Sequence, residues 1–262
     1  MVQKLVNVSV ANLYREPTFR SENTTQALLG ERVELLEYHE GFSLIRTSDR
    51  YQNWVDELQL CDPQLFPDWW VTARSHHFLI YSEPDTASPK IRDAVIGCKL
   101  ACLSKQNEWL QVILPDGATG WAQAKHFGTF PSLSRETVVA LAMEFIGYPY
   151  SWGGKSPKGL DCSGFVQLVF SLLKRPVFRD AWMQFGESRM ISENVSDAEP
   201  GDLYFFGENR DIATHVGIAL GNCKLVHSSG MIRINSLNSS DSNYYGKIAK
   251  NFLAVKTFFG SS

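Results

Sequence analysis

The spacing of apolar residues divides the chain into two halves. Up to about residue 128, apolar and polar positions alternate in short runs, a period typical of β-strands that bury one face. Turn-forming residues separate the runs, as at Glu40-Gly41 and Pro115-Asp116-Gly117. We therefore expect strands over residues 6–10, 32–38, 42–46, 53–55, 99–103, 109–114 and 121–122.

The first half contains an internal repeat. When the sequence is shifted by 67 residues against itself, several pairs coincide without a gap: Tyr14/Tyr81, Glu16/Glu83, Pro17/Pro84, Gly30/Gly97, Phe42/Trp109 and Trp54/Trp121. A unit of about 60 residues with closely spaced strands favours a small barrel, because closure removes exposed strand edges. We predict two all-β barrels, over 1–62 and 69–128, joined by a linker at 63–67. Trp54 and Trp121 are expected to fill the barrel interiors.

Beyond Pro131 the apolar residues follow a helical period. Ser134 is expected to cap a helix whose apolar stripe runs over 138–146 and which Gly147 ends. A second helix, with Cys162 in its first turn, is apolar nearly all round and should be buried. Strands are expected over 202–206, 215–220, 224–228 and 253–259. A helix pair followed by strands is the α+β pattern, so we predict a third domain over 132–262.

Cys162 has the position of a reactive thiol. Asp161 is its predicted N-cap, and the unpaired N–H groups at a helix start favour the thiolate. Such a nucleophile needs a base and a group that orients the base. His215 begins one predicted strand and His227 lies on the next, and the 12 residues between them suit two antiparallel strands joined by a tight turn. We predict that both rings face the helix start; zinc bound by Cys162, His215 and His227 is the alternative.

Two sets of motifs resemble known families. The segments Val10-Ala11-Asn12-Leu13-Tyr14-Arg15-Glu16-Pro17, Leu29-Gly30-Glu31 and Trp54-Val55 resemble bacterial Src-homology-3-like barrels. Four further motifs resemble, in order, the NlpC-type cysteine peptidases of bacterial cell-wall metabolism: Tyr150-Ser151-Trp152-Gly153-Gly154, Asp161-Cys162-Ser163-Gly164-Phe165, Pro200-Gly201-Asp202-Leu203 and His215-Val216-Gly217. The resemblance implies a papain-like fold in which Cys162 is the nucleophile, His215 the base and His227 the residue that orients the base.

The combination of paired barrels and peptidase resembles the γ-D-glutamyl-L-diamino-acid endopeptidases. This resemblance implies cleavage of murein peptides between D-Glu and diaminopimelate or lysine, often after a free N-terminal L-Ala. It also implies that Tyr150 lies near the oxyanion and that Asp161 and Ser163 bind the substrate ammonium. Trp152, in the same motif as Tyr150, is expected among the substrate-binding residues.

Composition excludes several other classes. With 262 residues and a net charge of -3, the chain lacks the basic surface expected of a nucleic-acid-binding protein. No apolar run reaches the roughly 18 residues of a membrane span, and the first ten residues lack a signal-peptide core. The five cysteines show no disulfide spacing, and reduced thiols suit a cytoplasmic protein. We expect a monomer without a metal or cofactor.

These observations lead to one functional hypothesis with two alternatives. A first barrel lying against the cleft would exclude glycan-linked stems, so we expect a cytoplasmic recycling enzyme that cleaves small murein peptides. The first alternative is a wall-anchored hydrolase that acts on intact peptidoglycan. The second is a non-catalytic protein, either wall-binding or zinc-loaded.

Overall fold

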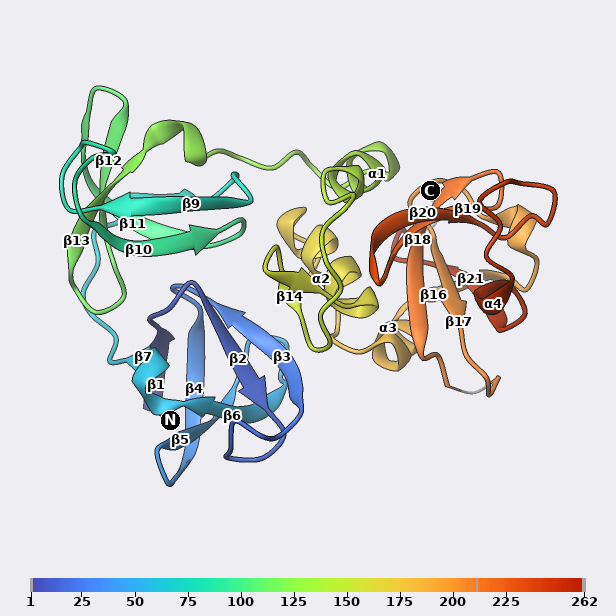
Figure 1. The fold of residues 1–262 in the computed structure, drawn as a ribbon, viewed down its shortest axis with the longest axis horizontal. Coiled ribbons are helices and arrows are strands. Elements are labelled where there is room, and N and C mark those ends of the chain that lie inside the picture. The colour runs from blue at the N-terminus through green and yellow to red at the C-terminus, as the bar shows by residue number, and fades with distance from the viewer. Residues whose placement is uncertain (1, 211, 261–262) are drawn as a thin grey trace. The chain divides into compact units, whose positions relative to one another are not determined.

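The structure, a computed structural model, describes residues 2–210 and 212–260. Residue 1 and residues 261–262, the ends of the predicted first and last domains, lie outside the described residues, as does residue 211. The chain forms two compact units, Met1–Phe130 and Pro131–Ser262 (Figure 1). Within the described residues, no helix has both the length and the apolar character that a membrane span requires.

The first unit consists of two antiparallel sheets of matching topology. The first sheet has the strand order β3-β2-β6-β5-β4-β1-β7, and the second has the order β10-β9-β13-β12-β11-β8. A shift of 67 residues places β3–β6 on β10–β13 residue for residue, so the repeat in the sequence is a repeat of barrels. The strands are β1 Val2–Val6, β2 Val10–Tyr14, β3 Asn23–Leu28, β4 Arg32–His39, β5 Phe42–Arg46, β6 Gln52–Asp56, β7 Leu60–Cys61, β8 Trp70–Thr72, β9 His77–Tyr81, β10 Lys90–Val95, β11 Lys99–Gln106, β12 Trp109–Ile113 and β13 Thr119–Gln123, with short 3-10 turns at Glu57–Gln59 and Ala124–His126.

The expectation that Trp54 and Trp121 fill the barrel interiors is wrong. Both side chains are only partly buried, and each lies opposite a tyrosine of the neighbouring strand, Tyr14 or Tyr81. Side chains alternate along a strand, so the neighbours of Trp54 point inward instead. Small and branched residues fill the first interior: Val6, Ala11, Leu13, Ala27, Val33, Ile45 and Val55.

The predicted strand over 6–10 is also wrong. β1 ends at Val6 and β2 begins at Val10, with a turn between them. Two backbone hydrogen bonds hold this turn, from the Gly30 N–H to the Val6 carbonyl (2.9 Å) and from the Leu29 N–H to the Ser9 carbonyl (3.2 Å). The alternation of apolar residues across 6–10 therefore spans two strands instead of one.

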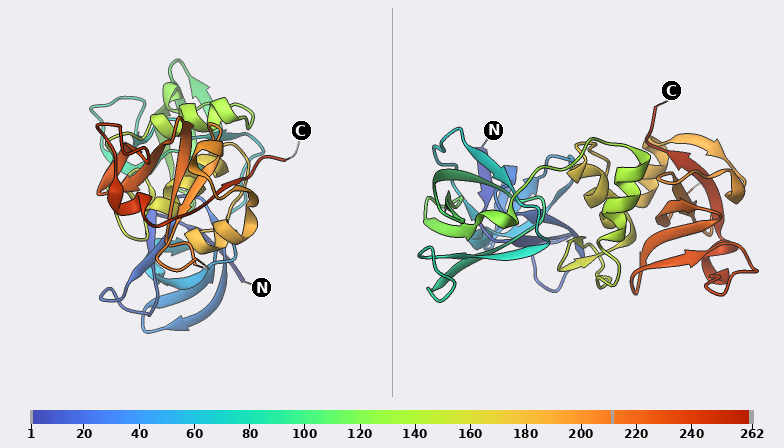
Figure 2. Two further views of the ribbon diagram at one scale, coloured as in Figure 1. Left: turned by 90° about the vertical axis from the view of Figure 1, so that its right-hand side faces the viewer. Right: turned by 90° about the horizontal axis from the view of Figure 1, so that it is seen from above.

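The second unit is an α+β domain built on one six-stranded antiparallel sheet. The strand order is β16-β21-β17-β18-β19-β20, and α1 and α2 form a layer along one face of the sheet (Figure 2). The elements of this unit that were not predicted from the sequence are α3, α4, β14, β15, β16 and β20. The helices are α1 Arg135–Met143, α2 Cys162–Leu172, α3 Ala181–Glu187 and α4 Gly246–Ala249, and the strands are β14 Lys155–Ser156, β15 Gly159–Leu160, β16 Arg189–Ser192, β17 Leu203–Phe206, β18 His215–Gly221, β19 Lys224–Ser229, β20 Met231–Ser236 and β21 Phe252–Thr257, with a 3-10 turn at Val195–Asp197.

The two predicted helices begin where their capping residues indicate. Ser134 accepts a hydrogen bond from the Thr137 N–H, and the Thr137 hydroxyl accepts one from the Ser134 N–H, which completes a capping box. Helix α2 contacts both α1 and the sheet, and Phe165 packs against Phe145 of the segment after α1 with ring centroids 6.1 Å apart. Because α2 contacts protein on all sides, it is apolar nearly all round.

Candidate active site

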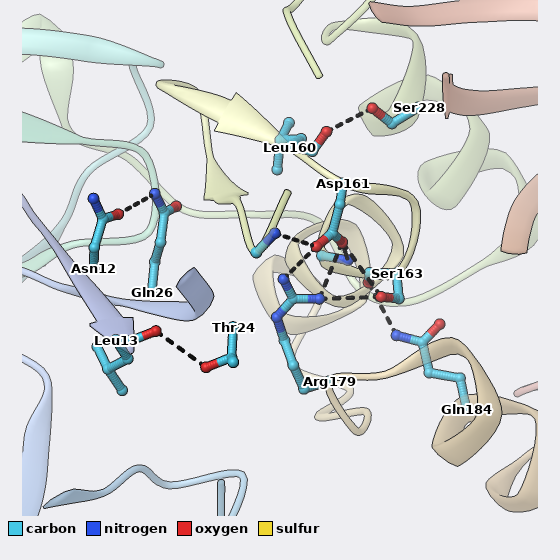
Figure 3. Close-up of polar contacts among 12 residues, drawn as sticks. Asn12, Leu13, Thr24, Gln26, Leu160, Asp161, Ser163, Arg179, Gln184 and Ser228 are labelled. Carbon is cyan, nitrogen blue, oxygen red and sulfur yellow. Dashed lines mark hydrogen bonds and ion pairs between the residues drawn. The ribbon is translucent and has the colours of Figure 1, made fainter. Parts of the chain in front are cut away.

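The start of helix α2 is held by the carboxylate of Asp161. Its Oδ1 accepts a hydrogen bond from the Gly164 N–H (2.7 Å) as an N-cap, and its Oδ2 accepts one from the Gly153 N–H (2.9 Å). The guanidinium of Arg179 binds the same carboxylate with both terminal nitrogens, at 3.0 and 2.6 Å (Figure 3). Three segments of the chain are thus joined at one carboxylate.

The loop before α2 packs directly on the first turn of the helix. A Cβ added to Gly164 would lie 2.1 Å from the carbonyl oxygen of Gly154, so no larger residue fits without movement of the backbone. The Asp161 N–H donates to the same carbonyl at 3.0 Å. The glycines of the two motifs therefore allow the close approach that places Cys162 at the helix start.

The thiol of Cys162 lies beside strand β18 and is 9% exposed. Its sulfur lies near the backbone of Val216, the residue after His215. Burial, followed by the charge of Asp161, raises the pKa of the Cys162 thiol to about 12, although the contacts with Val216, Arg179 and Ser163 lower it. The expectation of a thiolate from the helix start alone is wrong, because burial beside a carboxylate outweighs the backbone N–H groups.

The two predicted histidines meet in a hydrogen bond. Nε2 of His215, at the start of β18, lies 2.7 Å from Nδ1 of His227 on the neighbouring strand β19. Gly217 makes room for this contact, since a Cβ there would lie 2.9 Å from Cβ of His227. Burial lowers the pKa of His215 to about 3, with a further contribution from His227. Burial also lowers the pKa of His227 to about 4, so both rings are neutral near pH 7.

Asn235 is a site residue that sequence reasoning missed. Its Oδ1 lies 3.0 Å from Nε2 of His227, which is 0% exposed. Asn235 stands on β20, where Arg233 pairs with His227 and Asn235 pairs with Leu225. The sequence contains one signal for this strand: Gly230 lies between two short runs with apolar residues, a pattern compatible with a hairpin that places Asn235 beside the strand of His227.

The structure places Tyr150 near the thiol and Trp152 toward solvent. Burial first, and then electrostatic interaction with Cys162 and Asp161, raises the pKa of Tyr150 to about 12, which places the phenol in the electrostatic environment of the sulfur. Trp152 is 62% exposed. The oxyanion and substrate-binding roles of these two residues stay predictions.

The hydroxyl of Ser163 is engaged within the cluster around Asp161. It accepts a hydrogen bond from Nη1 of Arg179 (3.0 Å) and donates one to Oδ1 of Asp161 (3.3 Å), while its carbonyl accepts one from Gln184 (3.0 Å). Asp161 accepts five hydrogen bonds, and a carboxylate offers about four lone-pair sites. Binding of a substrate ammonium by Asp161 and Ser163 stays a prediction, and it would require displacement of one of these donors.

The zinc alternative conflicts with the hydrogen bonds of His227. Both of its ring nitrogens are used, one by His215 and the other by Asn235, so the neutral ring has no free lone pair for a metal. Among residues 2–210 and 212–260, no group of three His, Cys, Asp or Glu side chains is arranged to hold a metal ion.

Two family profiles match the sequence. Residues 147–252 match the NlpC/P60 family, and residues 13–60 match the bacterial dipeptidyl-peptidase Sh3 domain. The first match contains the whole hydrogen-bonded set from Cys162 to Asn235. The second lies within the first barrel.

Relatives cover the whole chain. Dipeptidyl-peptidase 6 of Lysinibacillus sphaericus is 31% identical, over 97% of this chain and 99% of its own length. The γ-D-glutamyl-L-lysine dipeptidyl-peptidase of Bacillus cereus is 27% identical over 78% of this chain, and the match spans 66% of that protein. A crystal structure of an NlpC/P60 family protein from Bacillus cereus shares the fold, with a TM-score of 0.84 at 20% identity over 98% of this chain and all of that one.

The buried ion pair predicts a large cost for losing one partner. We expect Arg179→Met to lower the free energy of unfolding of residues 131–262 by about 3–5 kcal/mol, because the Asp161 carboxylate stays buried without its cation. The double variant Arg179→Met/Asp161→Asn should recover part of the loss, since asparagine caps a helix well and carries no charge. Urea denaturation, with hydrogen exchange to localise the transition, measures both. Equal stability of Arg179→Met and the unsubstituted protein would contradict the prediction.

The buried histidines predict a dependence of stability on pH. The pKa of His227 is lowered in the folded state, so between about pH 6.5 and 4 the unfolded chain binds a proton that the folded chain does not. The free energy of unfolding should therefore fall as the pH falls through this range, by up to about 1.4 kcal/mol per pH unit for one histidine. The control is the His227→Gln variant, in which the carboxylates contribute to the pH dependence of the free energy of unfolding as they do in the unsubstituted protein. Urea denaturation at constant ionic strength should give a shallower slope for the variant, and equal slopes would contradict the prediction.

Proposed function

The chain belongs to the NlpC/P60 family and is a cysteine peptidase, and on that premise we propose that it hydrolyses murein stem peptides after D-Glu. The scissile bond joins the γ-carboxyl of D-Glu to a diamino acid, diaminopimelate or lysine. The name of the Bacillus cereus relative, a γ-D-glutamyl-L-lysine dipeptidyl-peptidase, supports this bond. A dipeptidyl-peptidase removes two residues from a free amino end, so the substrates are small peptides that begin with L-Ala.

The observation that carries the proposal is the hydrogen-bonded pair of histidines, one of which begins the strand that lies beside the buried thiol. Nε2 of His215 is bonded to His227, so Nδ1 is the nitrogen left for the thiol of Cys162. A thiol and an imidazole that are both neutral perform acyl transfer by general-base catalysis.

The reaction proceeds in two acyl-transfer steps. Sulfur of Cys162 attacks the γ-carbonyl carbon of D-Glu while its proton passes to Nδ1 of His215. That proton is returned to the nitrogen of the diamino acid, which leaves as an amine and yields a thioester. Water then attacks the thioester, again losing a proton to His215, and the free γ-carboxyl and the thiol are restored.

The oxyanion of each step is stabilised by two donors. The N–H of Cys162 is the first of the helix N–H groups that have no partner within the helix. The hydroxyl of Tyr150 is the second donor, since burial and the neighbouring negative charges raise its pKa and keep it protonated. Donors of this kind act where charge develops in the transition state.

We place the reaction in the cytoplasm, as a step in the recycling of wall peptides. All five cysteines are free thiols, among them Cys98 and Cys102 four residues apart. Disulfides are rare in reducing compartments and common in exported proteins, so unpaired thiols support a cytoplasmic location.

Hydrolysis of defined peptides tests the chemistry. L-Ala-γ-D-Glu-diaminopimelate should release L-Ala-D-Glu, and the N-acetylated peptide should be a poor substrate. Cys162→Ala should lower kcat/KM on the order of 10⁴-fold or more. Tyr150→Phe should lower kcat by about 10²-fold with little change in KM. Full turnover by Cys162→Ala would refute the assignment of the nucleophile.

Sedimentation with insoluble murein tests the proposed place of action. We expect the protein to stay in the supernatant and to cleave the soluble tripeptide there, because its substrate is a released peptide. Tight pelleting together with digestion of intact murein would favour the wall-anchored hydrolase instead. Cys162→Ala is the matched control for pelleting, since it separates binding from cleavage.

A further inference from the structure

A chain of hydrogen bonds continues beyond the two histidines into strand β20 and the loop after it. Nε2 of His227 lies 3.0 Å from Oδ1 of Asn235, and Nε of Arg233 donates to the same oxygen at 3.0 Å. Nδ2 of Asn235 donates to the backbone carbonyl of Asn243, also at 3.0 Å. Asn235 and His227 are both buried, so water does not compete for these contacts.

The two outer contacts decide which way the amide of Asn235 points. The Nε–H of Arg233 can only donate, and the carbonyl of Asn243 can only accept. A flipped amide would place two donors together at Arg233 and two acceptors together at Asn243. The oxygen of Asn235 therefore faces His227.

This orientation determines where the protons lie on both rings. An amide oxygen can only accept, so Nε2 of His227 carries the hydrogen, and the neutral ring is left with an unprotonated Nδ1. That Nδ1 accepts from Nε2 of His215, which therefore carries its hydrogen as well. The lone pair of His215 is thus on Nδ1, the nitrogen left for the thiol of Cys162.

We propose that Asn235 is a positioning residue that fixes the tautomer of His215 through His227. Arg233 and the carbonyl of Asn243 hold its amide in the required orientation. Without this acceptor, His227 can carry its hydrogen on Nδ1, and His215 can then carry its own on Nδ1, where it cannot take a proton from the thiol. The kinetic part of the inference rests on the proposed function, whereas the tautomers are a property of the resting protein.

Nitrogen NMR of the protein labelled with ¹⁵N-histidine tests the tautomers directly. We expect the resonances of His215 and His227 to report a hydrogen on Nε2 and none on Nδ1. In Asn235→Leu, both rings should lose this preference and show a mixture of tautomers. A hydrogen on Nδ1 of His215 in the unsubstituted protein, or unchanged tautomers in Asn235→Leu, would overturn the inference.

Kinetics of the same variants separate positioning from a general loss of structure. Asn235→Leu should lower kcat about 10–100-fold, as loss of the outer partners of functional histidines does, with KM unchanged. Asn235→Asp keeps an acceptor for His227 and should keep the tautomers and most of kcat. Its charge favours protonated imidazole, so the acid limb of the kcat/KM profile should move to higher pH. An acid limb unmoved in Asn235→Asp would overturn the inference even if Asn235→Leu fails to fold.

Asn243→Ala is the matched control, because Asn235 is hydrogen-bonded only to the backbone carbonyl of this residue. It should leave the tautomers and kcat unchanged.

In the His227→Gln background, Asn235→Leu should have no further effect on kcat, since the two residues act in series; additive losses would overturn the inference. If the protein hydrolyses no murein peptide but both rings carry their hydrogen on Nε2, the proposed function is refuted, whereas the role of Asn235 in setting the tautomers is retained.

Discussion

The position of the Cys162 sulfur, the proposed nucleophile, depends on one buried ion pair. Arg179 is 1% exposed and binds Asp161 through both terminal nitrogens, while two backbone N–H groups and the Ser163 hydroxyl complete the environment of the carboxylate. Burial lowers the pKa of Arg179, but the charge and hydrogen bonds of Asp161, together with the charge of Asp180, raise it above its usual value, so the guanidinium stays charged. Two buried charges are tolerable only with such complete hydrogen bonding, and here it joins the loop before α2, the helix itself and the segment after it.

The same carboxylate affects the chemistry of the sulfur it positions. Asp161 caps the helix, and its negative charge is also the second contribution, after burial, that raises the pKa of Cys162. The helix start therefore does not produce a resting thiolate. The proton has to move during the attack, which makes the acceptor nitrogen of His215 and its exact partner the decisive features of the site. Burial disfavours the charged forms of both the Cys162 thiol and the His215 ring. The hydrogen bonds from His215 through His227 to Asn235 then determine which ring nitrogens carry hydrogen.

Several predictions from the sequence succeeded because they rest on local contacts. The 67-residue repeat, the cap at Ser134 and the cap at Asp161 each involve residues close in the chain or related by duplication. The meeting of His215 and His227 could be anticipated because a tight turn joins their strands. Among the elements that were missed, β16, β20 and α3 have mixed polar and apolar residues and owe their conformation to neighbouring strands and helices.

The sequence by itself determined the two barrels, the α+β domain after them, and the residue types that meet at the start of α2. Periodicity, capping and turn chemistry act over a few residues, so they can be read along the chain. Only the tertiary structure decided that Arg179 pairs with Asp161, that Asn235 binds His227, and that burial raises the pKa of the Cys162 thiol. Those three outcomes depend on which distant side chains approach and how much water they exclude, and no local pattern encodes either quantity.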